Sequence, residues 1–230
     1  MRQYLIKDRS ICKNFSKRQN CGVDYIVVHD TGNWDKGASL DRHHSFFKNI
    51  SDNASYHHLV GNEGNEYKIY NFISEEYKAW HCGDGKGKYG ISNENSIGIG
   101  ICVNSDSDYK NNILGLARLA AELLIKHDLT IDRLVRHYDA SKKICPELMS
   151  FNDWKLWKGF YDLTNTIVNW LQSGANLQDI NNAILSEYEK FQNEYEEEIE
   201  FIKAKIEERT NVEEVEGELE EVLKSDDETK

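Results

Sequence analysis

The alternation of apolar and polar positions divides the first part of the chain into strands and helices. Short β-branched or alternating runs predict strands at residues 24–29, 55–60, 66–71, 96–103 and 133–137. Apolar residues that recur every three or four positions predict amphipathic helices at residues 39–49, 111–127 and 151–171. Because strands and helices interleave, the sequence predicts an α/β fold with a mixed central β-sheet flanked by helices.

The last quarter of the chain has a different apolar period. Apolar residues recur in steps of three, four and four from Leu177 to Ile206, which predicts one long helix with a nearly straight apolar stripe. The sequence Thr210-x-x-Glu213 resembles a capping box and predicts a second, shorter helix. The stripe contains aromatic residues, so it needs a partner: the second helix folded back, the preceding domain, or another subunit. We therefore expect a C-terminal α-helical appendage, either a coiled coil or a helical hairpin, that serves oligomerisation or targeting.

Charge divides the chain at nearly the same place. Residues 1–175 carry 22 Lys and Arg against 21 Asp and Glu, whereas residues 176–230 carry 6 against 19. We therefore expect a catalytic domain at 1–175 and an acidic helical region at 176–230 that could also form homo-oligomers. The acidity of this region argues against DNA or an anionic membrane as its partner, and we expect no nucleic-acid binding.

Two features of the sequence bear on the cellular location of the protein. No apolar run approaches the roughly 20 residues of a transmembrane helix, and residues 1–15 lack an apolar core of signal-peptide length. We therefore expect the protein to be cytoplasmic on synthesis. The five cysteines show no tight pair spacing and are expected to be free thiols or ligands, although a Cys12–Cys21 disulfide is an alternative.

Candidate chemistry is concentrated between residues 136 and 146. His137 follows a short predicted strand, and Pro146 ends regular structure directly after Cys145. Alone, this pair is typical of a loop histidine and a buried thiol, but a turn that joins an imidazole and a thiolate also suits zinc. His29 ends a strand that can neighbour the strand before His137, so the three side chains can converge. Two imidazoles and a thiolate would leave one tetrahedral position for water, as in catalytic zinc sites.

Five short motifs occur in order along the chain. They are Val27-Val28-His29-Asp30-Thr31-Gly32, Ser55-Tyr56-His57-His58-Leu59-Val60, Ala79-Trp80-His81-Cys82-Gly83, Asn95-Ser96-Ile97-Gly98-Ile99 and His137-Tyr138-Asp139-Ala140-Ser141-Lys142-Lys143-Ile144-Cys145-Pro146. In this order they resemble the zinc-dependent N-acetylmuramoyl-L-alanine amidases of the phage-lysozyme and peptidoglycan-recognition-protein family, over roughly residues 20–172. The resemblance implies one Zn²⁺ ion held by His29, His137 and Cys145. It also implies hydrolysis of the amide between N-acetylmuramic acid and L-alanine in bacterial peptidoglycan.

The resemblance further implies roles for other side chains. Tyr56 matches a strand tyrosine beside the metal, where it could orient water, donate to the oxyanion or help proton transfer to the leaving amine. Lys143, two positions before the cysteine ligand, matches a lysine that could stabilise the oxyanion. His81 matches a histidine on the rim of the substrate groove. Trp80 and Asn95 are further candidates for substrate binding, although Trp80 could equally belong to the core.

Several positions leave alternatives open. Gly100 stands where many relatives carry a glutamate, so a mechanism that depends on that carboxylate is in doubt here. Strand alternation allows only one of His57 and His58 to face the site. Asp139 could accept a hydrogen bond from a ligand histidine or cap a turn. The resemblance does not extend to residues 176–230.

These features together predict a phage-type endolysin that waits in the cytoplasm and acts on the cell wall after release. The alternative is a non-catalytic peptidoglycan-recognition or regulatory binding protein on the same fold. Such relatives typically lose a metal ligand, whereas the three ligands, Tyr56 and Lys143 are all present here. A third interpretation makes the C-terminal region the core of an oligomeric assembly that carries the amidase as cargo.

Overall fold

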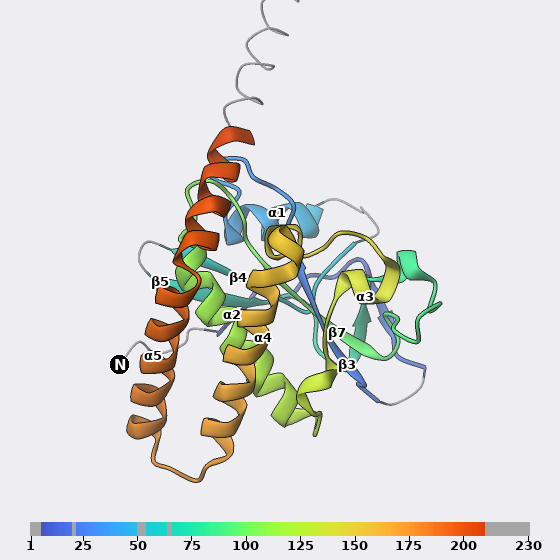
Figure 1. Ribbon diagram of the computed structural model, residues 1–230. Helices are drawn as coiled ribbons and strands as arrows, with labels where there is room; N and C mark the ends of the chain where they lie inside the picture. The colour runs from blue at the N-terminus through green and yellow to red at the C-terminus, as the bar shows by residue number, and fades with distance from the viewer. Residues whose placement is uncertain (1–5, 20–21, 50–53, 64–65, 210–230) are drawn as a thin grey trace, which may run out of the picture.

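The computed structural model describes residues 6–19, 22–49, 54–63 and 66–209, and a six-stranded mixed sheet forms its centre (Figure 1). In the order β1-β5-β4-β7-β3-β8, its strands are β1 (Ile6–Asp8), β5 (Glu66–Asn71), β4 (His58–Glu63), β7 (Ser96–Ile101), β3 (Tyr25–Asp30) and β8 (Leu134–Arg136). A separate antiparallel pair is formed by β2 (Phe15–Lys17) and β6 (Tyr77–Ala79). The predicted α/β fold with a mixed sheet is confirmed.

The central strands run parallel and are buried on both faces. β3 pairs in parallel with β7 and with β8, the strand that precedes His137. β4 pairs in parallel with β7 and antiparallel with β5. Parallel strands place their carboxyl ends at one edge of the sheet, so side chains that follow β3 and β8 are brought to the same place.

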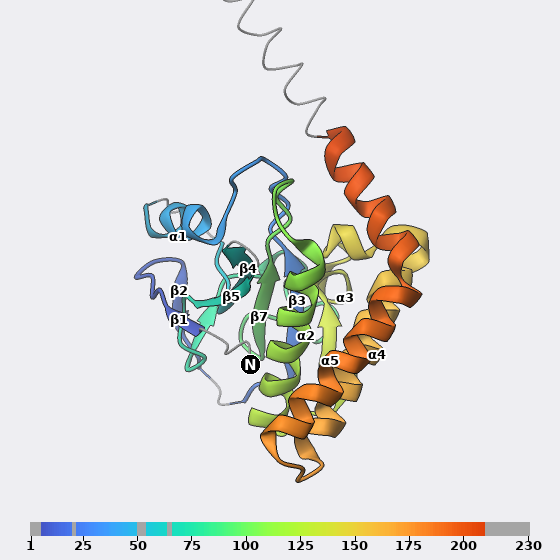
Figure 2. The ribbon, with the colours of Figure 1, turned by 90° about the vertical axis from the view of Figure 1, so that its left-hand side faces the viewer.

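Helices cover both faces of the sheet (Figure 2). α2 (Tyr109–Lys126) and α4 (Phe151–Gln172) pack on one face, and α1 (Leu40–Asn49) packs near the other. Ile26 and Val28 of β3 belong to the core under α2, so Val27 and His29 point to the opposite face. The alternation of a single strand therefore decides on which side of the sheet the candidate metal ligand lies.

The C-terminal helices are part of the same core. α5 (Leu177–Glu194) runs back along α4, and residues 196–209 continue as a helix (Figure 1). Seven stripe residues are buried in the cluster that also contains α2, α4 and the sheet: Ile180, Ile184, Tyr188, Phe191, Ile199, Ile202 and Ile206. Of the three partners expected for the stripe, the structure shows the preceding part of the chain. The helix predicted after Thr210 lies outside the described residues.

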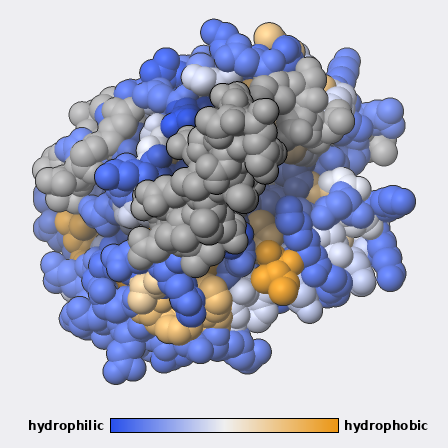
Figure 3. All heavy atoms as spheres, turned by 90° about the horizontal axis from the view of Figure 1, so that it is seen from above, coloured by the Kyte–Doolittle hydropathy of each residue, from blue (hydrophilic) through white to orange (hydrophobic). Residues whose placement is uncertain are grey.

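None of the helices in the described part of the chain combines the length and apolarity needed to cross a bilayer. Hydrophilic residues predominate on the face shown in Figure 3, and its hydrophobic residues form small separate areas.

The strand boundaries differ from the expected ones in two respects. β4 begins at His58 rather than at residue 55, because Ser55 and His57 bond irregularly to Trp80, Gly98 and Phe72 instead of forming a continuous ladder. The strands β1, β2 and β6 were not predicted, since three residues are too few for a periodic signal.

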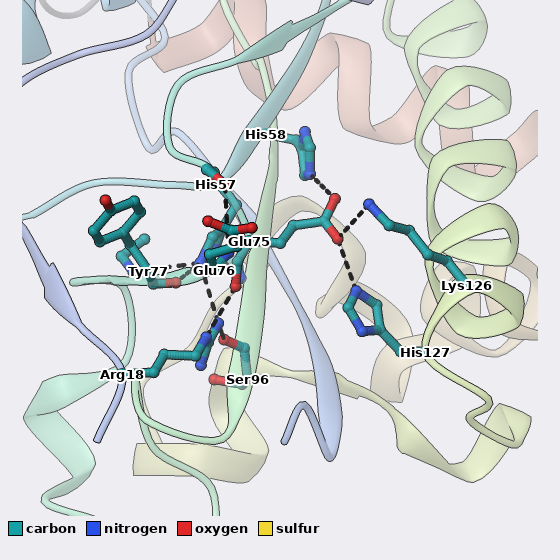
Figure 4. A network of polar contacts seen from close by, with 12 residues as sticks. Arg18, His57, His58, Glu75, Glu76, Tyr77, Ser96, Lys126 and His127 are labelled. Atoms are coloured by element: carbon teal, nitrogen blue, oxygen red, sulfur yellow. Dashed lines mark hydrogen bonds and ion pairs between the residues drawn. The ribbon is translucent and has the colours of Figure 1, made fainter. Parts of the chain in front are cut away.

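A partly buried polar cluster links the sheet to α2 (Figure 4). The Glu75 carboxylate accepts hydrogen bonds from His58 Nε2 at 3.2 Å, His127 Nε2 at 2.7 Å and Lys126 Nζ at 2.8 Å. Burial alone would raise the pKa of Glu75, but these three donors outweigh it and hold the pKa well below its usual value. We call these four residues the Glu75 cluster.

Glu75→Gln should lower the free energy of unfolding at pH 7 by about 2 kcal/mol, because two imidazoles and an ammonium group lose their charged acceptor. A carboxyl with a depressed pKa stabilises the fold above its unfolded pKa of 4.5 and loses this effect as the pH falls below it. Urea unfolding at pH 7 and pH 4 should therefore show a smaller difference from wild type at pH 4. Glu76→Gln, at the exposed neighbouring position, should change stability little; equal effects of the two variants would contradict the cluster's role.

Candidate metal centre

Three side chains from distant parts of the sequence converge at the carboxyl ends of β3 and β8. They are His29 in β3, His137 at the start of α3 (His137–Ser141), and Cys145 in the following loop. Their candidate ligand atoms all lie within 4.8 Å of one another, and all three residues are buried. Cys145 Sγ is 3.7 Å from His29 Nδ1. The structure thus brings together the three residues that the sequence suggests as ligands.

The donor atoms fit a metal ion. His137 Nδ1 is buried and has no hydrogen-bond partner among the described residues, while Nε2 of the same ring contacts Asp84 Oδ1 at 2.8 Å. Burial lowers the pKa of His29 and of His137, which favours the neutral imidazole that binds metals. Burial raises the pKa of the Cys145 thiol, and a divalent cation would oppose this by stabilising the thiolate. Two imidazole nitrogens and one sulfur are a donor set that zinc favours.

His81 contacts the second ring nitrogen of His29. His81 Nδ1 lies 3.1 Å from His29 Nε2, and its Nε2 lies 3.2 Å from Ser96 Oγ. A β-carbon at Gly98 would come within 2.4 Å of the His81 ring, so the glycine leaves room for this imidazole. Hydrogen bonding of a ligand's second nitrogen fixes its tautomer and orientation.

Two carboxylates that the sequence did not single out hold the site in place. Asp84, in a short turn after β6, contacts His137 as described. Asp30 Oδ2 accepts a hydrogen bond from the Leu148 backbone at 3.1 Å and so ties the loop after Cys145 to β3. Burial raises the pKa of Asp30 to about 6. Asp139 instead caps its own turn by accepting from Arg136.

A cavity of about 180 Å³ opens beside the three candidate ligands. Tyr56 lines it; its ring centroid is 5.4 Å from that of His29, and its hydroxyl donates to the Asp30 carbonyl at 3.3 Å. Lys143 lines the exposed side. The neighbouring Lys142 instead places its ammonium 4.7 Å from the ring centroid of Tyr89. Burial raises the pKa of Tyr56, so its hydroxyl stays protonated and can donate.

Of the three residues expected to bind substrate, two line the cavity and one does not. Trp80 and His81 line the cavity. Asn95 does not; its side chain bonds to Ser92 and Gly90 within the same loop. Neither His57 nor His58 lines the cavity.

These two histidines have structural contacts instead. His57 Nδ1 accepts from the Gly98 backbone, and burial lowers the pKa of His57 to about 3. His58 belongs to the Glu75 cluster.

Asp84→Asn should weaken zinc binding about tenfold, because a neutral amide orients and polarises the His137 imidazole less than a carboxylate does. The affinity can be measured by competition with a fluorescent zinc chelator at pH 7. The control is Asp139→Asn, since Asp139 bonds to Arg136 and has no described contact with a ligand. An unchanged affinity in Asp84→Asn would show that this contact does not position His137.

The comparisons with known proteins agree with this geometry. A protein family described as N-acetylmuramoyl-L-alanine amidase matches residues 18–148, a range that contains all three candidate ligands. The chain is 35% identical over 122 residues to the N-acetylmuramoyl-L-alanine amidase CwlH of Bacillus subtilis, a match that covers 53% of this chain and 46% of that protein. For the amidase XlyA of the same organism the identity is 34% over 122 residues, covering 53% of this chain and 39% of XlyA. The chain thus spans about half the length, or less, of these relatives.

Solved structures cover more of the fold. The catalytic domain of XlyA superposes with a TM-score of 0.58 at 30% identity, covering 69% of this chain and 97% of that domain. A mutant endolysin from Bacillus subtilis superposes with a TM-score of 0.59 at 29% identity, covering 70% of this chain and 98% of the endolysin structure. The residues beyond the family match at 148 include α4 and α5.

Proposed function

The chain belongs to the N-acetylmuramoyl-L-alanine amidase family, and on that premise we propose that it hydrolyses the amide between N-acetylmuramic acid and L-alanine in peptidoglycan. The observation that carries this proposal is the buried His29, His137 and Cys145 set, with its donor atoms within 4.8 Å, beside a cavity lined by Tyr56 and Lys143. The match covers only part of each relative, so the relatives' activity is a proposal for this chain.

We further propose that His29 Nδ1, His137 Nδ1 and Cys145 Sγ hold one zinc ion. Zinc bound there would act as a Lewis acid: it would polarise a carbonyl and lower the pKa of water to about 7. His81 and Asp84 keep the two imidazoles oriented through their other nitrogens. Asp30 holds the Cys145 loop against β3 by its bond to the Leu148 backbone.

The chain's own residues account for the remaining steps of amide cleavage. Tyr56 carries a protonated hydroxyl at the cavity, where it can donate to the oxyanion that develops on the scissile carbonyl or pass a proton to the leaving amine. Lys143 presents a cation at the same cavity and would stabilise that negative charge. Gly100 offers no carboxylate on β7, although Asp30 and Glu147 also line the cavity; on the family resemblance we take Tyr56 as our candidate for the proton transfer.

Substrate would lie along the open side of this cavity. Trp80 and His81 form part of its wall and are proposed to contact the substrate. Asn95 fastens the loop at Ser92 and Gly90, so we propose that it shapes the groove by holding the loop that carries Trp80 and His81.

Product analysis of digested cell wall tests the proposal. Wild-type protein with about one zinc per chain should release free L-alanine amino termini and no new reducing sugars. A chelator should abolish the release, and added zinc should restore it. New reducing sugars would show that a glycosidic bond is cut, and full metal occupancy without any product would favour the alternative of a peptidoglycan-binding protein. The retained ligand set favours the enzyme.

We propose the cellular role of a phage-type endolysin, synthesised in the cytoplasm and acting on the wall after release. The fold shared with a mutant endolysin from Bacillus subtilis at 29% identity supports it. Purified protein added to susceptible cells with permeabilised membranes should lower turbidity in a zinc-dependent way. Light scattering during size exclusion would separate a monomer from the homo-oligomer expected of residues 176–230.

A further inference from the structure

A second cavity lies apart from the metal centre and shares none of its lining residues. It has a volume of about 450 Å³ and lies between α2, α5 and the start of β5. This volume is in the range of about 300–1,000 Å³ that small-molecule sites occupy. In Figure 1, α5 lies on the left of the molecule, whereas α3, which begins with His137, lies on the right. We call this second cavity the α2–α5 groove.

The groove is elongated, because two helices line it with regularly spaced side chains. α5 contributes one face that runs from Gln178 to Gln192, which lie 14 positions or about 21 Å apart along the helix. Most of this face is polar, and Tyr188 lies where it meets the buried stripe that starts at Ile180. α2 contributes Asn111, Leu114 and Arg118 at helical spacing. An elongated groove favours a chain-like ligand over a compact one.

The groove is rich in carboxamides whose hydrogen-bonding capacity is only partly used. Asn181 Oδ1 accepts from Arg118 at 3.0 Å, and Asn182 Oδ1 accepts from Gln178 Nε2 at 3.0 Å. Gln192 Nε2 lies 3.3 Å from the Tyr188 hydroxyl. Among the described residues, these contacts leave the Nδ2 donors of both asparagines and the Oε1 acceptors of both glutamines available.

The available donors lie on the two central asparagines and the available acceptors on the two outer glutamines, so this helix face offers both kinds of hydrogen-bonding group along its length. Hydroxyl and amide groups of a ligand, which can each donate and accept, can pair with such a face.

The apolar and charged side chains of the groove narrow the ligand class. Leu185 is 47% exposed, and the ring of Tyr67 also lines the groove, so flat apolar surface accompanies the amides. The lining carries one cation, Arg118, and one anion, Glu189. Residues 176–230 hold 6 basic against 19 acidic residues. A polyanion such as a polyphosphate chain would be repelled here, and a neutral ligand would not.

We propose that the α2–α5 groove binds a neutral saccharide chain that bears hydroxyl and N-acetyl groups. This site goes beyond the proposed amidase activity. Because the groove and the metal centre are separate, a glycan held in the groove need not be the strand whose peptide is cut. Binding there would keep the enzyme at the wall and raise the effective concentration of nearby substrate.

An NMR titration of the whole chain with the trisaccharide of N-acetylglucosamine tests the site. The side-chain NH₂ signals of Asn181 and Asn182 should shift saturably. In the double variant Asn182→Ala and Gln192→Ala the affinity should fall about tenfold, as expected for the loss of one or two hydrogen bonds. Asn193→Ala, at an exposed position of α5 outside the groove, should bind as wild type does. The titration needs no catalysis, so it tests the groove even if the chain hydrolyses no amide of the cell wall.

Three outcomes would overturn the proposal. They are the absence of a saturable shift, equal affinity in the double variant, and shifts confined to Trp80 and His81 of the metal centre. A soluble polyglycerol phosphate that moves the groove signals in place of the trisaccharide would also overturn it. Leu185→Ser, at a half-exposed position, provides a second variant with an expected loss of affinity if the double variant fails to fold.

Discussion

Cys145→Ser should remove zinc and wall hydrolysis together, with a fall in activity of about 10³-fold or more. The thiolate is the one anionic ligand in the set, and a serine hydroxyl stays neutral and binds zinc weakly. The two imidazoles that remain are both buried and neutral and provide only two of the three protein ligands of a catalytic site. Zinc content by atomic absorption and release of L-alanine amino termini would be measured on the same preparation.

Cys82→Ser is the matched control for this substitution. Cys82 is also buried, and its sulfur lies 3.7 Å from Ser96 Oγ, so a serine there keeps a polar neighbour. This variant should retain about one zinc per chain and most of the activity. A Cys145→Ser protein that keeps its metal and works within tenfold of wild type would show that Cys145 is not a ligand.

Ile184→Asp should abolish cooperative folding or cost at least about 4 kcal/mol, because it places a carboxylate where the side chain is fully buried. Ile184 lies in the cluster that joins α5 to α2 and α4. The adjacent Leu185 is 47% exposed, so Leu185→Asp should cost less than about 1 kcal/mol. Urea unfolding followed by circular dichroism would give both values, and equal effects would mean that the stripe does not face the core.

Truncation after residue 175 extends this test. It removes seven buried apolar side chains, each worth about 1.5–3 kcal/mol on burial. Their sum exceeds about 10 kcal/mol, comparable with the whole stability of about 5–15 kcal/mol of a typical domain, even though ordering the helix offsets part of it. We therefore expect fragment 1–175 to be insoluble or incompletely folded. A soluble fragment with a cooperative transition would support the separate catalytic domain expected from the sequence.

The long periodic elements were predictable because their apolar spacing is set by one helix face. Helices α2 and α4 begin and end within about two residues of their expected bounds. The candidate ligands could also be predicted from the sequence, since His29 and His137 each lie at the end of a strand. What the strand periodicity could not give was the pairing of β3 with both β7 and β8, which brings those ends together.

The supporting residues were harder to predict, because their roles depend on contacts between loops. Asp84 lies 53 positions from His137 and carries no local pattern that distinguishes it from Asp139. Similarly, strand alternation places His57 and His58 on opposite faces only in a regular strand, whereas β4 starts only at His58. The partner of the C-terminal stripe was left open among three choices, since apolar spacing shows that a face is buried but not against what.

The two glycines of β7 have a consequence for how the metal centre responds to its ion. Gly98 makes room for His81, and a β-carbon at Gly100 would lie 3.6 Å from the Tyr56 ring, so one wall of the site rests directly on the central sheet. The opposite wall, with Lys143 and Cys145, is an irregular loop. Groups held by strands are preorganised, whereas loops adapt. Metal loading and release should therefore be accommodated by the Cys145 side, while the His29 side keeps one arrangement throughout the catalytic cycle.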